Sequence, residues 1–331
     1  MSESVIDPIT PEVADSYDLL RVDCGRFPSD DLAIVALDGE DRKGWLQGQA
    51  TNNLRSMDLG ASSAFCICEP TGQIVSICEL WSLADRFVIT MSKEALSGFL
   101  KRVEQMVILE SVSAAVLDGY RLFSIQGPGA TYRVGDLMEL PKLDAGEAEF
   151  EKSRVSLLRS NRAGLGGWDI LVPADAKRAI AKLESEFEPI HPEAAEIIRI
   201  EAGIPKFGQD TNAKTMPPEL GPAFDARHVS YNKGCYTGQE VLMRIKSRGH
   251  MNRSWVGLVA DEPLEAGANV RHPKRPDAGE VTSAAFSPAN GFIGAAMLRI
   301  EAALPGGTVT VETQSGPVEA EVREMPILRF E

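Results

Sequence analysis

The sequence is short of positive charge, and it has no long apolar run. It carries 34 Lys and Arg against 48 Asp and Glu, a formal net charge of -14, so most of the surface repels a phosphate backbone and general nucleic-acid binding is not expected. No run approaches the roughly 18 apolar residues that span a bilayer, and the N-terminal MSESVIDPIT lacks the basic and apolar regions of a signal peptide. We therefore expect a cytoplasmic protein with no membrane partner.

Signatures of nucleotide and metal sites are also missing. No G-x-G-x-x-G follows a predicted strand, and no P-loop is present. The cysteines are odd in number and lack paired C-x-x-C spacing, which argues against a disulfide framework, a structural zinc site and an iron–sulfur cluster held by this chain alone. The five are Cys24, Cys66, Cys68, Cys78 and Cys235. We predict no metal ligands.

Three of these cysteines lie in FCICEPTGQIVSIC (65–78). If the dipeptide Pro70–Thr71 forms the tip of a two-residue hairpin loop, Cys66 faces Val75, Cys68 lies on the same side, and Cys78 lies on the opposite face. One face of the sheet then cannot present all three thiols. We interpret them as buried, apolar cysteines.

The first 250 residues predict mixed α and β structure. The strand-like run LAIVAL (32–37) precedes a helix in RKGWLQGQ with Asp38 as its N-cap, three strand-like runs follow, and residues 93–107 have apolar residues at helical spacing. A similar order returns after residue 112, with a helix near 129–138 and another in ADAKRAIAKLESE. We therefore predict an α+β fold of two related α/β sandwich subdomains, of ferredoxin-like type, rather than a doubly wound parallel sheet.

A different pattern begins after residue 252. Six short strand-like runs are separated by Gly, Pro and Asn, with no helical stretch of comparable strength. This pattern is typical of a small all-β barrel. We place the domains at residues 1–251 and 252–331.

The octapeptide KGCYTGQE (233–240) contains the strongest functional candidate. Thr237 and Glu240 match a capping box, with Thr237 as the N-cap of a helix. Cys235 then lies just before the positive end of that helix and close to Lys233, and both features favour a thiolate. From the chemistry alone, a packed thiol and a functional thiol are both open.

A basic segment surrounds this octapeptide. Residues 227–253 contain six Lys or Arg and one acid, Glu240. Arg244 and Arg248 share a predicted helix face, as expected for a helix that lines an anion site. Two interpretations are open: a site for an anionic small molecule, and a solvated face whose charges are compensated by folded neighbours. Nucleic acid is a lesser third option.

KGCYTGQE and the Arg-rich segment after it closely resemble the signature of the YgfZ family of folate-binding proteins, whose mitochondrial branch is Iba57. That family belongs to the superfamily of the glycine cleavage T-protein, an aminomethyltransferase. GWLQGQATNN (44–53), RIEAGIPKFGQD (199–210) and the C-terminal β region resemble segments shared by the whole superfamily. The resemblance spans nearly the whole chain. It implies a tetrahydrofolate cofactor, iron–sulfur client or assembly proteins as partners, and Cys235 as the key residue.

Two segments depart from the transferase pattern. Ser76 and Ile77 stand where the T-protein has acidic residues that include its catalytic aspartate, and RAGLGGWDI (162–170) replaces a longer turn whose glutamate holds the pterin. A missing carboxylate argues against aminomethyl transfer by the T-protein route, since acid–base catalysis needs a titratable group at the reacting centre. In the opposite direction, PPELGP (217–222) resembles the transferases.

The sequence thus predicts a tetrahydrofolate-binding accessory protein that supports the maturation or repair of iron–sulfur enzymes through Cys235. The alternatives are a folate-dependent aminomethyltransferase or demethylase, and a scaffold with a vestigial folate cleft. Trp45 could instead belong to the core, and Arg199 could form a structural pair with Glu201. The predicted folate-binding residues are Lys233, Tyr236, Gln239, Glu240, Arg244, Lys246 and Arg248 around the octapeptide, and Trp45, Gln47, Asn52 and Arg199 elsewhere.

Overall fold

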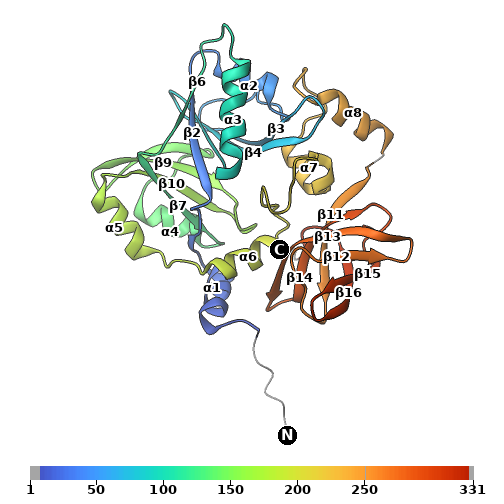
Figure 1. The fold of residues 1–331 in the computed structure, drawn as a ribbon. Helices are drawn as coiled ribbons and strands as arrows, with labels where there is room; N and C mark the ends of the chain where they lie inside the picture. The colour runs from blue at the N-terminus through green and yellow to red at the C-terminus, as the bar shows by residue number, and fades with distance from the viewer. Residues whose placement is uncertain (1–7, 250, 328–331) are drawn as a thin grey trace.

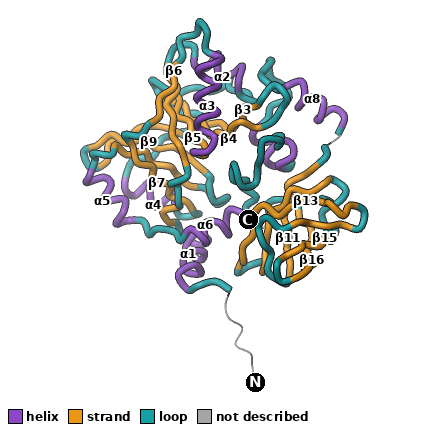
Figure 2. Tube along the Cα trace, in the orientation of Figure 1, coloured by secondary structure: helices purple, strands orange, loops and turns teal. Residues whose placement is uncertain are grey.

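The computed structural model describes residues 8–249 and 251–327, without the side chain of Arg248. Over these residues the chain forms two five-stranded sheets and a closed six-stranded barrel (Figure 1). Figure 2 shows the strands of the two sheets gathered on one side of the molecule and those of the barrel on the other. The predicted α+β fold with a C-terminal β-barrel is confirmed.

The first sheet is antiparallel, with strand order β3-β4-β5-β2-β6. Two helices, α2 and α3, accompany it, and α3 begins where the hydroxyl of Ser92 accepts a hydrogen bond from the backbone N–H of Glu94. A buried apolar cluster built around Trp45, Leu46, Phe65 and Phe99 fills the space between these helices and the sheet. The elements are β2 (Leu32–Asp38), α2 (Arg42–Gln49), β3 (Ser62–Cys68), β4 (Ile74–Ser82), β5 (Phe87–Ser92), α3 (Lys93–Met106) and β6 (Ser113–Val116).

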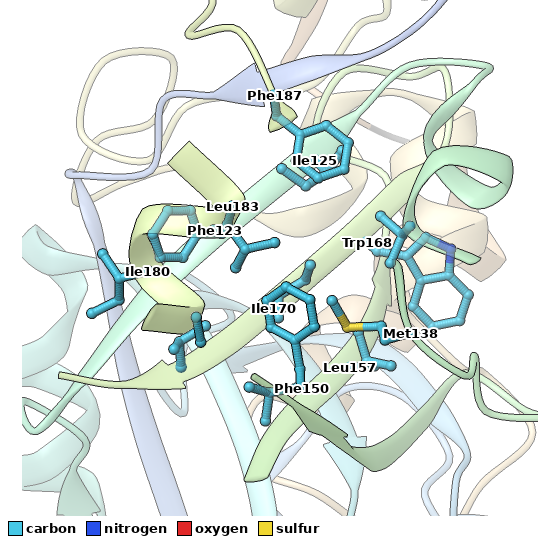
Figure 3. Packing of buried hydrophobic residues seen from close by; sticks show 14 of the residues in the cluster. Phe123, Ile125, Met138, Phe150, Leu157, Trp168, Ile170, Ile180, Leu183 and Phe187 are labelled. Carbon is cyan, nitrogen blue, oxygen red and sulfur yellow. The ribbon is translucent and has the colours of Figure 1, made fainter. Parts of the chain in front are cut away.

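The second sheet repeats this arrangement, with strand order β1-β7-β10-β9-β8. Strand β7 occupies the place of β2, and the edge strand comes from the N-terminal segment of the chain instead of following the last helix. Figure 3 shows aromatic and aliphatic side chains packed between this sheet and its helices. The elements are β1 (Gly25–Phe27), β7 (Tyr120–Gln126), α4 (Ala130–Leu137), β8 (Ala145–Phe150), β9 (Ser153–Ser160), β10 (Gly167–Pro173) and α5 (Lys177–Glu186).

The barrel closes in the order β11-β14-β13-β12-β15-β16 and has its own aliphatic core. Its strands are β11 (Arg253–Ala260), β12 (Asn269–His272), β13 (Arg275–Ser287), β14 (Gly291–Arg299), β15 (Thr308–Thr313) and β16 (Gly316–Arg323).

Four helices and a short 3-10 turn lie outside the two sandwiches and the barrel. Helices α1 and α6 pack together beside the barrel, and α7 lies between the first sheet and the barrel (Figure 1). These elements are α1 (Pro11–Val22), α6 (Pro192–Glu201), η1 (Pro217–Leu220), α7 (Pro222–His228) and α8 (Gln239–Arg248).

Two local predictions are wrong. Helix α2 begins at Arg42 rather than after Asp38, because residues 39–41 form a turn; the carboxylate of Asp41 accepts a hydrogen bond from the N–H of Ser111 instead of capping the helix. In the β3–β4 hairpin, Cys66 pairs with Ile77 rather than Val75. The loop is longer than two residues, since the N–H of Glu69 bonds the carbonyl of Gln73 and Gly72 adopts a positive φ of 91°.

The shift in the hairpin is by two residues, an even number, so the faces of the strand are unchanged. Cys66 and Cys68 belong to one buried cluster and Cys78 to another on the opposite face of the sheet. Cys24 is buried as well. The interpretation of Cys66, Cys68 and Cys78 as packed apolar side chains is confirmed.

Candidate functional site

A central cavity of about 900 Å³ lies where the two sandwiches meet the segment that leads to the barrel. Its wall combines β4 and β5 of the first sandwich, residues 160–164 of the second, helices α6 and α7, and the loops 27–32 and 202–207. Much of the lining is apolar, with side chains such as Phe27, Ile77, Met91, Phe207 and Phe224. The polar side chains are few and come from distant parts of the chain, as is typical of small-molecule sites.

Glu79 and Arg227 form an ion pair on this wall. Because side chains alternate along a strand, Glu79 lies on the same face of β4 as Ile77, and both line the cavity. The Arg227 guanidinium lies 2.5 Å from a Glu79 carboxylate oxygen. Burial raises the pKa of Glu79 above its ordinary value, and the positive charges of Arg227 and Arg162 offset only part of that rise.

Ser76 and Ile77 stand where acidic residues are expected in a transferase, and the structure shows where each of the two lies. Ser76 is fully buried on the other face of β4, next to the sulfur of Cys78, and Ile77 supplies only apolar surface. Glu79 nevertheless brings a carboxylate to the cavity two residues further along the same strand. The cavity therefore does contain an acidic group with a raised pKa, which the sequence argument overlooked.

Arg162 is held against the second sandwich by Asp169 of β10. The Arg162 Nε lies 2.9 Å from a carboxylate oxygen of the fully buried Asp169, and its Nη2 donates to the hydroxyl of Thr90 across the two sandwiches. Burial alone would lower the pKa of Arg162, but Asp169 more than compensates and raises it. The RAGLGGWDI segment thus supplies a fixed positive charge at the cavity.

Arg199 connects the cavity to the barrel. It is buried, and its guanidinium donates to Glu196, to the carbonyl of Ile204 and to Asp210, as well as to the Ser283 hydroxyl on β13. Glu196 and Arg199 both line the cavity. Arg199 is therefore both a structural ion-pair residue and part of the wall, although its partners are Glu196 and Asp210 rather than Glu201.

The octapeptide lies outside this wall. Of the predicted site residues whose side chains are described, Arg199 alone lines the central cavity. The Lys233 ammonium donates to the carbonyls of Gln47, Ala50 and Asn52 at 2.6–2.7 Å, at and just beyond the C-terminal end of α2. The ammonium group uses all three of its N–H donors in these bonds. Lys233 therefore anchors the segment and has no donor left to stabilise a thiolate at Cys235.

Cys235 is exposed, unlike the other four cysteines. The next residue, Tyr236, is buried, and its ring packs 5.0 Å from the Lys233 ammonium. The Tyr236 hydroxyl is buried without a hydrogen-bond partner among the described residues. Lys233 and Tyr236 hold the segment on either side of the exposed Gly234 and Cys235, which leaves the thiol at the surface of an anchored segment.

Helix α8 does not start with the predicted capping box. It begins at Gln239, after Gly238 with a positive φ of 87°, and no side chain caps it. Glu240 instead binds Arg244 at 3.1 Å, with both side chains exposed, and the Gln239 amide donates to the carbonyl of Lys233. The cause is Gly238, whose left-handed backbone ends the preceding turn and displaces Thr237 from the N-cap position.

Most of the basic residues around the octapeptide have acidic partners. Arg244 pairs with Glu240, Lys246 with Asp225 and Arg253 with Glu219, as Arg227 does with Glu79. These pairs agree with the interpretation of a compensated, solvated face. Figure 1 shows α8 at the edge of the molecule. The side chain of Arg248 lies outside the described part of the chain.

The three early candidates hold the structure together locally. Trp45 belongs to the core of the first sandwich, and its Nε1 donates to the carbonyl of Met106. Gln47 accepts from the N–H of Leu54. The amide of Asn52 donates to the carbonyls of Ala64 and Arg227. None of the three contributes to the wall of the central cavity.

A seam of hydrogen bonds nevertheless joins the octapeptide to the cavity wall. Asn52 bonds the carbonyl of Arg227, the Thr51 hydroxyl bonds the carbonyl of His228, and Lys233 bonds the carbonyl of Asn52. Arg227 and His228 line the cavity on the far side of this seam. A continuous set of hydrogen bonds therefore links the segment that carries the exposed thiol to the cavity wall.

The comparisons with known proteins assign this arrangement of two related sandwiches and a barrel to the aminomethyltransferase-like superfamily. The GCVT N-terminal domain matches residues 7–227, and the glycine cleavage T-protein C-terminal barrel domain matches residues 253–328. The chain belongs to the glycine cleavage T-protein family. The octapeptide lies between the two matched spans.

The relatives carry two different descriptions. An aminomethyltransferase of Cupriavidus necator is 24% identical, over 95% of this chain and 89% of the relative. The tRNA-modifying protein YgfZ of Vibrio vulnificus is also 24% identical, over 68% of this chain and 67% of the relative. The solved glycine cleavage system aminomethyltransferase T from Bartonella henselae has a TM-score of 0.84 at 21% identity, covering 96% of this chain and 89% of that chain, and shows the shared fold.

Two further observations concern the described residues only. None of their helices combines the length and apolarity needed to cross a membrane. No group of three or more His, Cys, Asp or Glu side chains among them is placed to hold a metal ion.

Proposed function

We propose that this protein binds a reduced folate in its central cavity and, with Cys235 at its surface, serves as an accessory protein for the maturation or repair of iron–sulfur enzymes. The observation that carries the proposal is the cavity itself. Its volume of about 900 Å³ lies within the range of small-molecule sites, roughly 300–1,000 Å³, and its lining is largely apolar with a few charged groups.

The lining suits the chemistry of a reduced folate. A flat pterin ring and an aminobenzoyl ring need apolar surface, which Ile77, Met91 and Phe224 offer. The N–H edge of the pterin needs an acceptor such as the Glu79 carboxylate, and the glutamate tail needs cations such as Arg162 and Arg227. Bound folate supplies the nitrogen atoms that carry one-carbon units.

Cys235 suits contact with a macromolecular partner rather than with the cavity. Its thiol is the exposed one of the five cysteines, and it sits on a segment anchored by Lys233 and Tyr236. The seam through Asn52 joins that segment to Arg227 and His228 of the wall. The cavity and the thiol thus lie in different places, with hydrogen bonds through Asn52 and Thr51 between them.

Two variants test this proposal. Cys235→Ala is expected to bind tetrahydrofolate as the wild type does, measured by anaerobic titration calorimetry, and to lose support of an iron–sulfur enzyme in cells that lack the wild-type protein. The exposed neighbour Asn232→Ala is the matched control and should keep both properties. Full support of the client enzyme by Cys235→Ala, or no tetrahydrofolate binding by the wild type, would overturn the proposal.

A second candidate function is favoured by Glu79. A carboxyl group whose pKa is raised by burial keeps its proton to a higher pH than an ordinary carboxyl group and can transfer it at a ligand nitrogen, as folate-dependent one-carbon transfer requires. This function predicts formation of 5,10-methylenetetrahydrofolate that depends on an aminomethyl or methylated amine donor. Glu79→Gln should then slow the reaction by about 10²–10⁴-fold. Absence of product with the wild type excludes it.

A further inference from the structure

His228 is a buried polar residue of the cavity wall that neither proposed function uses. It is the last residue of α7 and is only 4% exposed. Its ring stacks on Phe224, one helical turn earlier, with centroids 3.8 Å apart and planes 12° from parallel. Both residues line the cavity. The imidazole is therefore fixed in position before any ligand enters.

The hydrogen bonds of the ring fix its tautomer. Nδ1 lies 3.0 Å from the backbone carbonyl of Phe224, and a carbonyl oxygen only accepts, so Nδ1 carries the hydrogen. In a neutral imidazole Nε2 is then an acceptor with a free lone pair. No described residue donates a hydrogen bond to it.

The environment keeps the imidazole neutral. Burial, and to a smaller extent the neighbouring guanidinium of Arg227, together lower the pKa of His228 to about 3, against the smaller opposing effect of the bond to Phe224. A histidine with such a pKa is a neutral imidazole at physiological pH, with its one hydrogen on Nδ1. It acts as a fixed hydrogen-bond acceptor on an otherwise apolar part of the wall, beside Phe224.

We propose that Nε2 of His228 selects the reduced form of the folate ring by accepting a hydrogen bond from a ring N–H. This inference rests on the proposed binding of folate in the cavity. In tetrahydrofolate the ring nitrogens N5 and N8 carry hydrogens, whereas in folic acid the same atoms present only lone pairs. Nε2 of His228 gains a hydrogen bond when it faces a ring N–H of tetrahydrofolate. When it faces a lone pair of folic acid, both Nε2 and the ring nitrogen are left without a donor.

The other donors of the pterin have better partners in the same cavity. The 2-amino group and N3–H lie side by side on one edge, and a carboxylate accepts two such donors together. The wall holds four carboxylates, those of Asp30, Asp31, Glu79 and Glu196. A single neutral acceptor such as Nε2 of His228 fits an isolated ring N–H, which only the reduced ring provides.

The test compares two ligands and three proteins. We expect the wild type to bind tetrahydrofolate about 10–100-fold more tightly than folic acid, the effect of one buried hydrogen bond made or left unmade. His228→Phe keeps a flat ring against Phe224 and removes the acceptor. This variant should bind tetrahydrofolate and folic acid with affinities within about threefold of each other, mainly because its affinity for tetrahydrofolate falls. His228→Gln, whose amide oxygen can accept, should restore part of the preference.

A spectroscopic measurement covers the case in which these variants fold poorly. In ¹⁵N-histidine-labelled wild-type protein, the Nε2 resonance of His228 should move on addition of tetrahydrofolate and stay in place on addition of folic acid. Equal shifts with both ligands would contradict selection at Nε2.

The outcomes separate this inference from the proposed function. Wild-type protein that binds no folate at all would refute folate binding itself. Wild-type protein that binds tetrahydrofolate and folic acid equally, or a folded His228→Phe variant that keeps the full preference, would overturn the role of His228 and leave folate binding intact.

Discussion

Glu79 and Arg227 are paired across the cavity wall, yet their environments differ. The Glu79 side chain keeps 25% of its surface accessible and that of Arg227 keeps 44%. Burial raises the pKa of Glu79 above the ordinary 4.5, so between 4.5 and the raised value the folded protein binds more protons than the unfolded chain. Stability contributed by this group is therefore complete below pH 4.5 and is lost as the pH rises through the window.

We expect Glu79→Gln to remove this pH dependence. The free energy of unfolding of the wild type, relative to that of the variant, should decrease as the pH rises from 4.5 through the raised pKa. Urea denaturation at a series of pH values measures it. Glu240→Gln, which removes an exposed carboxylate, is the matched control. Parallel curves for wild type and Glu79→Gln would show that Glu79 does not titrate in this window.

Lys233 is a structural anchor rather than an activating charge. Its ammonium holds three carbonyls around the end of α2, and burial together with Arg55 lowers its pKa to about 8. We expect Lys233→Met to lower the free energy of unfolding by about 1–3 kcal/mol, because buried carbonyls lose their donors. Lys43→Met, which removes an exposed ion pair with Asp58, should cost less than about 1 kcal/mol.

The stability of Lys233→Met also distinguishes a lysine that anchors the octapeptide from one that activates the thiol of Cys235. Chemical unfolding followed by tryptophan fluorescence measures both lysine variants. If Lys233→Met were as stable as the wild type while the reactivity of Cys235 fell sharply, the lysine would act on the thiol after all. The bonds to Gln47, Ala50 and Asn52 predict the reverse.

Helix α8 shows why a short motif can mislead. Thr237 and Glu240 have the spacing of a capping box, and that pattern takes account only of hydrogen bonds local to the helix. The start of α8 is fixed by Gly238, whose backbone lies against the β3–β4 hairpin. Such a contact between residues distant in sequence has no signature in the octapeptide. The β3–β4 loop is a similar case, since the left-handed Gly72 lengthens the turn.

Gly238 and Gly249 flank α8 and give a matched pair of variants. Both have positive φ, 87° and 66°. A Cβ on Gly238 would lie 2.7 Å from the carbonyl oxygen of Glu69, whereas one on Gly249 would meet nothing within 4 Å. We expect Gly249→Ala to cost about 1 kcal/mol, the backbone penalty alone, and Gly238→Ala about 2–4 kcal/mol. Equal losses in thermal unfolding would show that the hairpin contact carries no energy.

The larger pattern of the chain was readable from its sequence. Repeated β and α runs predicted two related sandwiches, and Gly- and Pro-separated runs predicted the barrel, because apolar periodicity reports which face of an element is buried. The central cavity was not readable in this way. Phe27, Glu79, Arg162 and His228 come from four separate elements or loops, and no local spacing connects them. Helix α6, which supplies part of that wall, and helix α1, which packs against α6, were also missed.

The barrel is joined to the rest of the molecule by a buried charge network. Both carboxylate oxygens of Asp210 are used: one accepts from Thr282 and Ser283 of β13, the other from Arg199 of α6 and the backbone N–H of Lys206. Arg199 also lines the cavity. The position of the barrel and the shape of the cavity therefore depend on the same buried ion pair.

We expect Asp210→Asn to weaken both the attachment of the barrel and the binding of tetrahydrofolate in the cavity. Loss of one member of a buried pair costs about 3–5 kcal/mol. Arg199 would keep Glu196 but lose Asp210, its fully buried partner, so we expect a loss at the lower end of this range. Calorimetry should then show the barrel melting separately from the sandwiches, and tetrahydrofolate affinity should fall in the same variant. Glu321→Gln, which removes an exposed pair with Arg323 on the barrel, should change neither. An Asp210→Asn protein that melts in a single transition with unchanged affinity would mean that apolar packing of α1 and α6 holds the barrel without the ion pair.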